Sequence, residues 1–384
     1  MKSLLPPEAY TCDAWFEREQ ARVFRPLWQF VAPRMMLAKP DAFVRRRLAG
    51  VDVVVQNIEG RLCAFENVCA HRQSPLQTED HGVRPLVCPY HAWRYGSQGE
   101  VVNIPWEHAC YRFSESERQA LRIRQFEVHE FGQLVFVKLS DEPLDFGSQF
   151  DADAVSDLQR ASEVFDDEVL VTRFEGRFNW KLAYENLRDS LHPRFLHTST
   201  VYQQVKFEAR IDEAALARTH AYREAGSRDR AEHLAWLRTF SGGGPNEPMP
   251  DLPRYAWHDY VQRHGQDDWY LNWLMYPNLH IASGSAGYSF IIEHHVPVSA
   301  QRTDLWVYYV TGRKKRKYPT SAAVLMAHLE GAEKVLAEDI AIMEKVQGSL
   351  HPGTPRATTG DFEHANMAIE RWYVDTLEGR HALA

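Results

Sequence analysis

Two cysteines and three histidines lie within one stretch of 25 residues, CAHRQSPLQTEDHGVRPLVCPYHAW. Four of them form two mixed pairs, Cys69-x-His71 and Cys88-x-x-His91, with 16 residues between the pairs. Thiolates and imidazoles together bind either tetrahedral zinc or an iron–sulfur cluster. The pairs therefore predict a metal centre built from two loops, whereas His81, which lies between them, is expected to be an exposed loop histidine.

The composition of the pairs separates these two kinds of centre. Zinc ribbons usually use Cys-x-x-Cys pairs, whereas each loop here supplies one cysteine and one histidine. A Rieske [2Fe–2S] cluster requires that composition, because two histidines replace two cysteines on one of its two irons. Each loop can then send its cysteine to one iron and its histidine to the other. A structural zinc site stays open as the alternative at this point.

A second group of potential ligands lies in NWKLAYENLRDSLHPRFLH, residues 179–197. Asp189 and His192 are three residues apart, so they would share one face of a helix. His192 and His197 are five residues apart, which places them about 140° apart around a straight helix. They can converge on one metal only if the helix is distorted, and Pro193 is the natural place for that distortion. Ordinary, partly buried histidines are the alternative explanation.

A long helix is predicted from about residue 320 to 348, and one acidic residue interrupts its apolar stripe. The stripe advances by steps of three and four through Leu325, Leu329, Ala332, Leu336, Met343 and Val346. Asp339 falls on this stripe, where a buried carboxylate is costly unless it is paired or coordinated. Glu338 lies off the stripe and is expected to be solvated. Asp339 and two histidines would form the triad of non-haem Fe(II) oxygenases, unless Asp339 forms a buried salt bridge instead.

Both groups of residues resemble motifs of the catalytic α subunits of Rieske non-haem iron oxygenases. CAHR followed by CPYHAWRYGSQGEVVNIP is similar to the Rieske signature of that family. The patterns Asn-Trp-Lys, Glu-Asn and Asp-x-x-His-x4-His, together with EDIAIMEKVQ, are similar to its mononuclear iron motifs. Gln73 and Ala92 depart from the family, which commonly has glycine at these two positions. Neither departure removes a ligand, but each could alter its loop and the potential of the cluster.

The resemblance implies a role for nine residues. The proteins of this family bind a [2Fe–2S] cluster and a mononuclear Fe(II). Transferred residue by residue, the cluster ligands are Cys69, His71, Cys88 and His91, and the iron ligands are His192, His197 and Asp339. Asn186 would lie near the iron. Asp189 would be the acid that hydrogen-bonds a cluster histidine, expected to be His91, of a neighbouring subunit.

The implied activity is that of a terminal oxygenase component. Electrons from NAD(P)H would arrive only indirectly, through a separate reductase, with or without a ferredoxin. They would pass from the cluster through the His91–Asp189 contact to the iron, where O2 is activated. No strand–GxGxxG–helix unit is present, so no NAD or flavin domain is evident in this chain. A homotrimer is expected, because Asp189 needs the cluster of the next subunit.

The substrate is expected to be small, and two kinds of reaction stay open. YENLRDSLHPRFLH is closest to enzymes that hydroxylate single-ring aromatics, either as mono- or as dioxygenases. HRQSPL resembles members that demethylate at oxygen or nitrogen, and EDIAIMEKVQ resembles members that act on quaternary amines. Aromatic hydroxylation, as in the catabolism of aromatic compounds, is preferred. A Rieske electron-transfer protein without oxygenase activity and a zinc-dependent structural protein are the alternatives of another class.

The elements that must position these motifs indicate an α+β protein. Residues 10–30 have the spacing of an amphipathic helical arm, and short β runs follow from about 40 to 140. The acidic, turn-rich stretch 141–158 is a plausible boundary, followed by antiparallel strands and the long helix. The predicted architecture is an N-terminal β-rich Rieske domain and a C-terminal helix-grip domain, in which an antiparallel sheet packs against a long helix. The predicted boundaries are 1–39 for the arm, 40–150 for the Rieske domain and 151–384 for the catalytic domain.

The composition narrows the remaining classes of protein. The chain has 384 residues and a net charge of −8, which argues against general nucleic-acid binding. No apolar run approaches the length of a membrane span, and the start, MKSLLPPEAYTC, does not resemble a signal peptide. Five cysteines without a disulfide pattern lead us to expect a reduced, cytoplasmic protein. RKKRK, at 313–317, is expected to be a solvated loop, with docking of an acidic ferredoxin or a flavoprotein reductase as the alternative.

Overall fold

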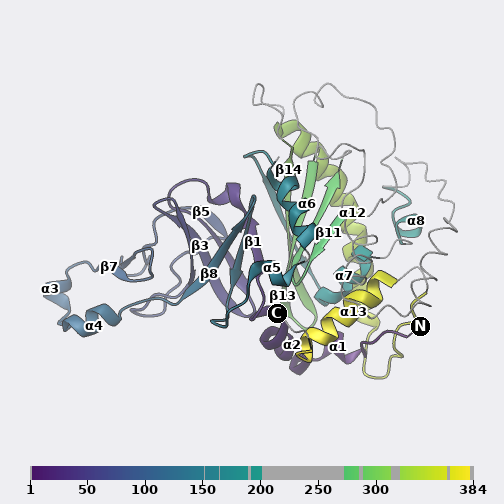
Figure 1. Ribbon diagram of the computed structural model, residues 1–384, viewed down its shortest axis with the longest axis horizontal. Coiled ribbons are helices and arrows are strands. Elements are labelled where there is room, and N and C mark those ends of the chain that lie inside the picture. Colours follow the sequence, from purple (N-terminus) through teal and green to yellow (C-terminus); the bar gives the residue numbers. More distant parts are fainter. Residues whose placement is uncertain are drawn as a thin grey trace. The chain divides into compact units, whose positions relative to one another are not determined.

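The computed structural model describes residues 2–150, 152–163, 165–188, 192–200, 272–284, 289–312, 321–360 and 364–380. The chain divides into two compact units. The first, here called the β unit, is Phe24–Gln149, and the second, the α+β unit, combines Met1–Val23 with Phe150–Ala384. Each unit contains an antiparallel sheet, which confirms the predicted α+β class (Figure 1).

The β unit is built on a seven-stranded sheet with the order β1-β9-β8-β4-β3-β2-β5. All neighbouring strands in it are antiparallel. Its strands are β1 (Gln29–Pro33), β2 (Ala42–Leu48), β3 (Val51–Ile58), β4 (Arg61–Glu66), β5 (His81–Val83), β8 (Gln125–Phe131) and β9 (Leu134–Lys138). A second sheet pairs β6 (Arg94–Tyr95) with β7 (Val101–Asn103). The short helices of the unit are α3 (Glu107–Cys110), α4 (Glu115–Ala120) and α5 (Phe146–Gln149).

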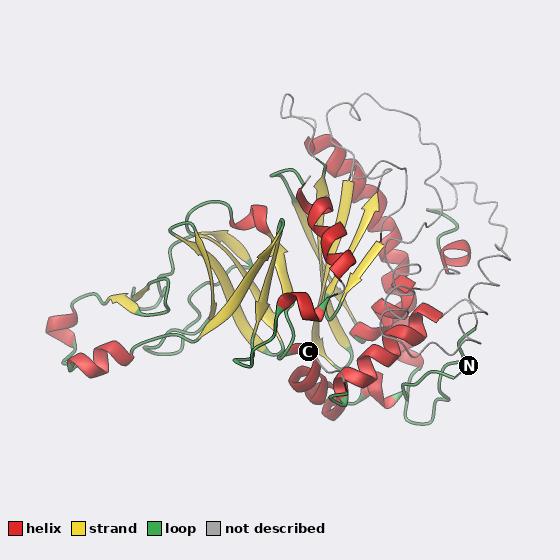
Figure 2. Cartoon of the chain, in the orientation of Figure 1, coloured by secondary structure: helices red, strands yellow, loops and turns green. Residues whose placement is uncertain are grey.

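The core of the β unit extends into both cysteine loops. Figure 2 shows the large sheet curled rather than flat. One cluster of buried side chains joins strand residues such as Val54 and Phe65 with Cys69, Cys88 and Trp93. Packing of this kind holds side chains in defined positions. The two loops are therefore fixed parts of the core of this unit rather than surface flaps.

The sequence predicted most strands of this sheet correctly but did not predict its first strand, β1. The predicted strand at Val51–Ile58 coincides with β3, whereas the strand predicted at Leu86–Cys88 is wrong, since only Val87 forms an isolated bridge there. The helical prediction for 10–30 is wrong beyond Phe24, because Gln29–Pro33 forms β1. The residues up to Val23 belong to the α+β unit, and those from Phe24 on belong to the β unit. A short, fully buried apolar run is compatible with either helix or strand, so periodicity could not distinguish them.

The α+β unit has a five-stranded antiparallel sheet with the order β10-β14-β13-β12-β11. Its strands are β10 (Leu170–Gly176), β11 (Asn272–Met275), β12 (Leu279–Gly284), β13 (Ser289–Ser299) and β14 (Arg302–Thr311). Its helices are α1 (Glu8–Thr11), α2 (Asp13–Glu19), α6 (Ala152–Glu163), α7 (Trp180–Arg188), α8 (His192–Leu196), α12 (Ser321–Ser349) and α13 (His364–Leu377), with a π-helix at Gln20–Phe24. None of the helices in the described ranges is long and apolar enough to cross a membrane.

Helix α12 covers one face of this sheet (Figure 1). Leu325, Ala332 and Leu336 pack against Leu305 and Val307 of β14. The apolar stripe explains this contact, because residues three and four apart share one face of a helix. The helix thereby confirms the predicted helix-grip arrangement.

Other expectations for this unit differ from the structure. The predicted stripe fails at its end, because Val346 is exposed and Gln347 is buried. The boundary region 141–158 contains α5 and the first part of α6 rather than turns alone, and α13 was not predicted. The RKKRK run and the irregular stretch predicted at 202–268 lie outside the described residues.

A buried charge pair attaches the N-terminal helices to the start of α7. The Lys181 ammonium lies 2.5 Å from Glu19 Oε1, and both side chains are almost fully buried. Trp180 Nε1 donates to Glu19 Oε2 at 2.9 Å, and the Tyr373 hydroxyl donates to Glu19 Oε1. Burial lowers the pKa of Lys181, although Glu19 acts in the opposite direction. The first turn of α7 is therefore held in place by one fully buried carboxylate.

Replacing this carboxylate should destabilise the α+β unit strongly. Glu19→Gln leaves the Lys181 charge buried without a counter-charge, which costs about 3–5 kcal/mol. The control is Glu378→Gln, because Glu378 pairs with Arg18 on the surface and such pairs contribute about 1 kcal/mol or less. Urea unfolding followed by circular dichroism compares the two variants. Equal free energies of unfolding for Glu19→Gln and Glu378→Gln would show that the buried Glu19–Lys181 pair does not stabilise the α+β unit.

Candidate metal centres

The two cysteine loops share one backbone design. In the first loop, the Gln73 N–H donates to the Cys69 carbonyl at 2.9 Å. In the second, the Ala92 N–H donates to the Cys88 carbonyl at 3.0 Å. Gln73 and Ala92 both have left-handed backbone conformations, with φ of 58° and 57°. Each loop therefore curls back onto its cysteine through a left-handed residue four positions later.

This design explains the two departures from the family motif. Glycine reaches positive φ without a steric penalty, whereas residues with a Cβ atom pay for it. Gln73 and Ala92 occupy the two positions where glycine is common, and both retain the conformation that favours it. Both cysteines also donate their own N–H groups to the residue after the left-handed one, at 2.9 Å in each case. The substitutions thus leave the loop geometry intact and add strain.

The side chains of the two loops meet the requirements of a [2Fe–2S] cluster. Cys69 and Cys88 are 1% and 2% exposed, and the imidazole rings of His71 and His91 lie 4.6 Å apart. The Nδ1 atoms of both histidines are buried without a hydrogen-bond partner among the described residues. Buried polar atoms normally have a partner. Two buried sulfurs and two such nitrogens are a donor set that a Rieske cluster would satisfy.

Neighbouring aromatic residues fix the orientation of His71. Its ring stacks on Trp93 with centroids 4.6 Å apart and an angle of 5° between the planes. Its outer nitrogen, Nε2, lies 3.5 Å from the Tyr111 hydroxyl, so Nδ1 is the atom that faces inward. Burial lowers the pKa of His71, with a smaller contribution from His91. A neutral imidazole with a free inner nitrogen is the form that binds a metal.

Tyr95 directs its hydroxyl group at one of the cysteine sulfurs. The Tyr95 hydroxyl accepts the Ala70 N–H at 2.9 Å and lies 3.0 Å from Cys69 Sγ. Burial raises the pKa of Tyr95 well above its ordinary value, and Cys69 adds to this shift. The tyrosine therefore keeps its proton. When Cys69 is a thiolate, which can only accept, the Tyr95 hydroxyl is the donor of this pair.

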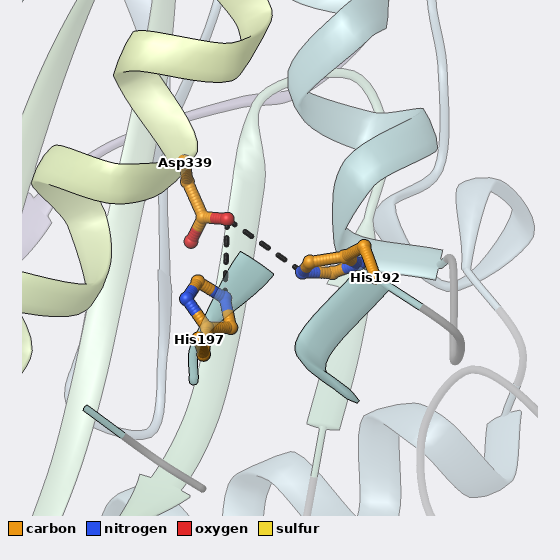
Figure 3. Close-up of side chains that lie close together, drawn as sticks. All are labelled: His192, His197 and Asp339. Carbon is orange, nitrogen blue, oxygen red and sulfur yellow. Dashed lines mark ion pairs between the residues drawn. The ribbon is translucent and has the colours of Figure 1, made fainter. Parts of the chain in front are cut away.

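The second group of predicted ligands meets in the α+β unit (Figure 3). His192 Nε2 and His197 Nε2 lie 3.6 Å and 3.2 Å from the same Asp339 oxygen, Oδ1. One ligand atom from each residue lies within 4.8 Å of the other two. Among the described residues, these three side chains form a group that could hold a single metal ion. Two imidazoles and one carboxylate with other directions left open suit non-haem Fe(II).

His192 and His197 can approach the same carboxylate because α8 ends between them. Helix α7 ends at Arg188, α8 begins at His192, and α8 ends at Leu196. His197 thus lies just beyond α8, where it is no longer bound by the helical repeat. The convergence comes from this helix end rather than from a distortion within a continuous helix. Asp189 lies outside the described residues.

Two further side chains hold the ligands in place. Asn186 Nδ2 donates to Asp339 Oδ1 at 3.3 Å, which places the residue predicted to lie near the iron against a predicted ligand. Glu338 was expected to be solvated; its side chain is still 22% exposed, but its Oε2 lies 2.8 Å from His197 Nδ1, a contact that the expectation did not include. Burial lowers the pKa of His197, but Asp339 and Glu338 outweigh this effect and raise it overall. The sequence missed Glu338 because its partners are about 140 residues away.

A third buried polar group was not predicted from the sequence. Glu293 Oε2 lies 3.0 Å from His280 Nδ1 and 3.4 Å from His295 Nε2. Burial raises the pKa of Glu293, but the two histidines outweigh burial and leave it well below its ordinary value. The Tyr184 ring, on α7, contacts the His295 ring edge to face at 5.2 Å. The alternation on β13 puts Glu293 and His295 on one face, but only the pairing with β12 identifies His280 as their neighbour.

Two family models match the chain and define its class. The Rieske [2Fe-2S] domain matches residues 27–126. The ring hydroxylating alpha subunit (catalytic domain) matches residues 160–379. These two parts together are the domains of ring-hydroxylating α subunits, a class that combines a Rieske [2Fe–2S] cluster with mononuclear non-haem iron. The protein belongs to the ring-hydroxylating α subunit family, which confirms the predicted family and the predicted pair of cofactors and removes the zinc alternative.

The chain is also similar to curated oxygenase subunits. It is 27% identical over 202 residues to the anthranilate 1,2-dioxygenase large subunit of Burkholderia cepacia, covering 51% of this chain and 48% of that protein. It is 28% identical over 264 residues to the large oxygenase component of salicylate 5-hydroxylase of a Ralstonia species, covering 64% and 59%. With the carnitine monooxygenase oxygenase subunit of Acinetobacter pittii it shares 28% over 193 residues, covering 49% and 50%. The matches thus span about half the length of these relatives.

Solved structures with the same fold cover almost the whole chain. The quaternary ammonium Rieske monooxygenase CntA in complex with L-carnitine has a TM-score of 0.67 and 17% identity, covering 97% of this chain and 95% of that one. Naphthalene 1,2-dioxygenase with indole bound has a TM-score of 0.68 and 16% identity, covering 98% and 92%. At this level of identity the likeness establishes the fold.

Restoring glycine in the second cysteine loop should stabilise the protein. Ala92→Gly removes the strain of an exposed residue with positive φ, for an expected gain of about 0.5–1 kcal/mol. The control is Ala70→Gly, because Ala70 is equally exposed but is not among the residues with positive φ. That change should destabilise by about 0.4–1 kcal/mol, since glycine only makes the unfolded chain more flexible. Urea unfolding of both variants gives the comparison, and shifts of the same sign would contradict the explanation.

Proposed function

We propose that this chain is the terminal oxygenase component of a Rieske oxygenase system. It uses O2 and electrons from a separate NAD(P)H-dependent reductase, with or without a ferredoxin, to hydroxylate a small aromatic substrate. The observation that carries the proposal is the meeting of His192, His197 and Asp339, whose ligand atoms lie within 4.8 Å of one another. An electron-transfer protein without oxygenase activity has no use for such a site.

The proposal assigns the cluster and the iron to separate units. The [2Fe–2S] cluster is held by Cys69, His71, Cys88 and His91, an assignment supported by the buried sulfurs and the unpartnered Nδ1 atoms. Fe(II) is held by His192, His197 and Asp339, and iron in such a site supplies the binding and reductive activation of O2. The Rieske domain corresponds to the β unit, Phe24–Gln149, and the catalytic domain to the α+β unit.

The residues around the iron ligands position them for this role. Asn186 donates to the Asp339 carboxylate and so fixes the direction of its oxygens. Asp189 is proposed as the acid that hydrogen-bonds His91 of a neighbouring subunit, within a homotrimer, and so bridges the path of electrons from the cluster to the iron. Its support is its place in the chain, directly after α7 and three residues before His192. A solved structure with the same fold, that of a quaternary ammonium Rieske monooxygenase, gives insights into inter-subunit electron transfer in that protein.

The choice between two substrate classes rests on the relatives. Anthranilate 1,2-dioxygenase and salicylate 5-hydroxylase are named for aromatic acids, which favours aromatic hydroxylation. Carnitine monooxygenase and choline monooxygenase of Beta vulgaris favour the second candidate, a monooxygenase that catalyses O- or N-demethylation, including that of quaternary amines. The buried Glu293 does not require a cationic substrate, since two imidazoles already lie against its carboxylate. We therefore keep aromatic hydroxylation as the first candidate.

Metal analysis of the purified protein tests the proposed function. Full occupancy of both centres gives about three irons and two sulfides per chain, since a [2Fe–2S] cluster contributes two of each. Asp189→Ala should keep these contents and lose NADH-driven product formation with a surrogate reductase. About two irons per chain, unchanged by His192→Ala, would instead indicate an electron-transfer protein. Near-normal turnover by Asp189→Ala would remove the bridging role.

A substrate panel separates the two substrate classes. Anthranilate and salicylate represent the aromatic acids, and carnitine and choline represent the quaternary amines. We expect O2 consumption to be coupled to hydroxylated product with the aromatic acids alone. Products formed only from the quaternary amines would establish the second candidate.

Removing the Tyr95 hydroxyl should lower the reduction potential of the cluster. A hydrogen bond to a ligand sulfur stabilises the reduced cluster, which carries more negative charge. Losing about 1–1.4 kcal/mol of that stabilisation in Tyr95→Phe corresponds to a decrease of about 40–60 mV for one electron. Redox titration followed by electron paramagnetic resonance measures the change. Tyr111→Phe is the control, because its hydroxyl faces His71 at 3.5 Å rather than a sulfur. An unchanged potential in Tyr95→Phe would contradict donation to the sulfur.

A further inference from the structure

Glu338 binds three side chains of the short segment that ends the histidine motif. Its Oε2 lies 2.8 Å from His197 Nδ1 and accepts the Thr200 hydroxyl at 2.8 Å. Its Oε1 accepts the Ser199 hydroxyl at 2.6 Å. The segment is itself closed by a backbone hydrogen bond from the Thr200 N–H to the His197 carbonyl at 3.2 Å. A compact turn, 197–200, is thus attached to α12 through one carboxylate.

The two nitrogens of His197 face two different carboxylates. Nδ1 faces Glu338 at 2.8 Å, and Nε2 faces Asp339 at 3.2 Å. A neutral imidazole has one N–H and can donate to only one of them. If Nδ1 carries the proton and donates to Glu338, the lone pair of Nε2 points at Asp339. A cation between Nε2 and the Asp339 oxygen satisfies both atoms, and His192 Nε2 lies 3.6 Å from the same oxygen.

We infer that Glu338 is the positioning residue for the iron ligand His197, setting its tautomer and anchoring its turn to the helix that carries Asp339. The inference rests on the proposed function, because it requires His197 to be a metal ligand. A carboxylate that accepts the outer N–H of a ligating histidine fixes the ring and strengthens the nitrogen as a donor. Glu338 and Asp339 are adjacent in the chain, so one turn of α12 supplies a ligand and the support of another. The two Glu338 hydrogen bonds from Ser199 and Thr200 keep the carboxylate directed at this turn.

Equilibrium dialysis with Co(II) tests this inference without measuring activity. The mononuclear site is emptied with a chelator that leaves the cluster in place, as its visible spectrum shows. Bound cobalt is then measured against free Co(II), with the His197→Ala chain as the background. Glu338→Gln and Glu338→Ala should weaken cobalt binding by about 10- to 100-fold, the usual effect of losing such a partner. Glu338→Asp keeps the charge and should recover part of the loss.

A matched control separates positioning from general damage. Glu330→Gln makes the same chemical change on the same helix, eight positions earlier, at an exposed residue, and should bind cobalt like the unmodified chain. Proton magnetic resonance of the cobalt-loaded protein gives a second readout. The exchangeable Nδ1 proton of His197 should be visible in the unmodified chain and lost by fast solvent exchange in Glu338→Ala.

The possible outcomes distinguish this inference from the proposed function. Cobalt affinity within twofold of the unmodified chain in both Glu338→Gln and Glu338→Ala overturns the role of Glu338, provided His197→Ala loses the site. Equal binding by the unmodified chain and His197→Ala overturns the iron site itself. If Glu338→Ala does not fold, Glu338→Gln and Ser199→Ala decide the matter, and Ser199→Ala should weaken binding less than Glu338→Gln.

Discussion

The requirement that a buried charge must have partners organises the catalytic half of this protein. Asp339 is in line with Leu336 and Met343 on α12, and its side chain is only 13% exposed, so an isolated carboxylate would be disfavoured there. Its partners are His192 at the start of α8, His197 just after α8 and the side-chain amide of Asn186 on α7. Asn186 lies on α7, and the buried Glu19–Lys181 pair holds the first turn of that helix. The buried Glu19 carboxylate thus holds α7, the helix whose Asn186 donates to Asp339.

The cysteine loops also contain buried polar atoms, and here neutral groups of the backbone and of aromatic side chains hold them in place. Their cysteine sulfurs are buried among apolar side chains, and the Nδ1 atoms of the two histidines are buried without a hydrogen-bond partner among the described residues. The backbone instead curls each loop around its cysteine, and stacking on Trp93 turns His71 so that Nδ1 faces inward. Gln73 and Ala92 both adopt the left-handed conformation although neither is glycine. Preorganised loops of this kind let the cluster change its charge with little movement of the protein.

The parts of the structure that were predictable from the sequence are those encoded in local spacing. Cys69, His71, Cys88 and His91 stand in a local pattern, and the apolar stripe located α12 and drew attention to Asp339. The sequence could not reveal that α8 ends before His197, because a helix end depends on packing as well as on local residues. It also missed β1, since a short buried run fits helix or strand. His280, Glu293 and His295 form a cluster through strand register, which is a property of the sheet rather than of any one segment.

Glu338 and Asp339 show why a hydrophobic pattern is an incomplete guide to polar residues. The pattern separates a helix into a packed face and a free face, and on that basis only Asp339 needed an explanation. The free face of α12 is covered at this point by the turn 197–200, which contributes hydroxyl groups and an imidazole rather than apolar side chains. A polar contact of this kind leaves no apolar signal in the helix. Carboxylates adjacent to a ligand on the chain therefore need to be judged by what other segments bring to them, and here that segment carries the second histidine of the site.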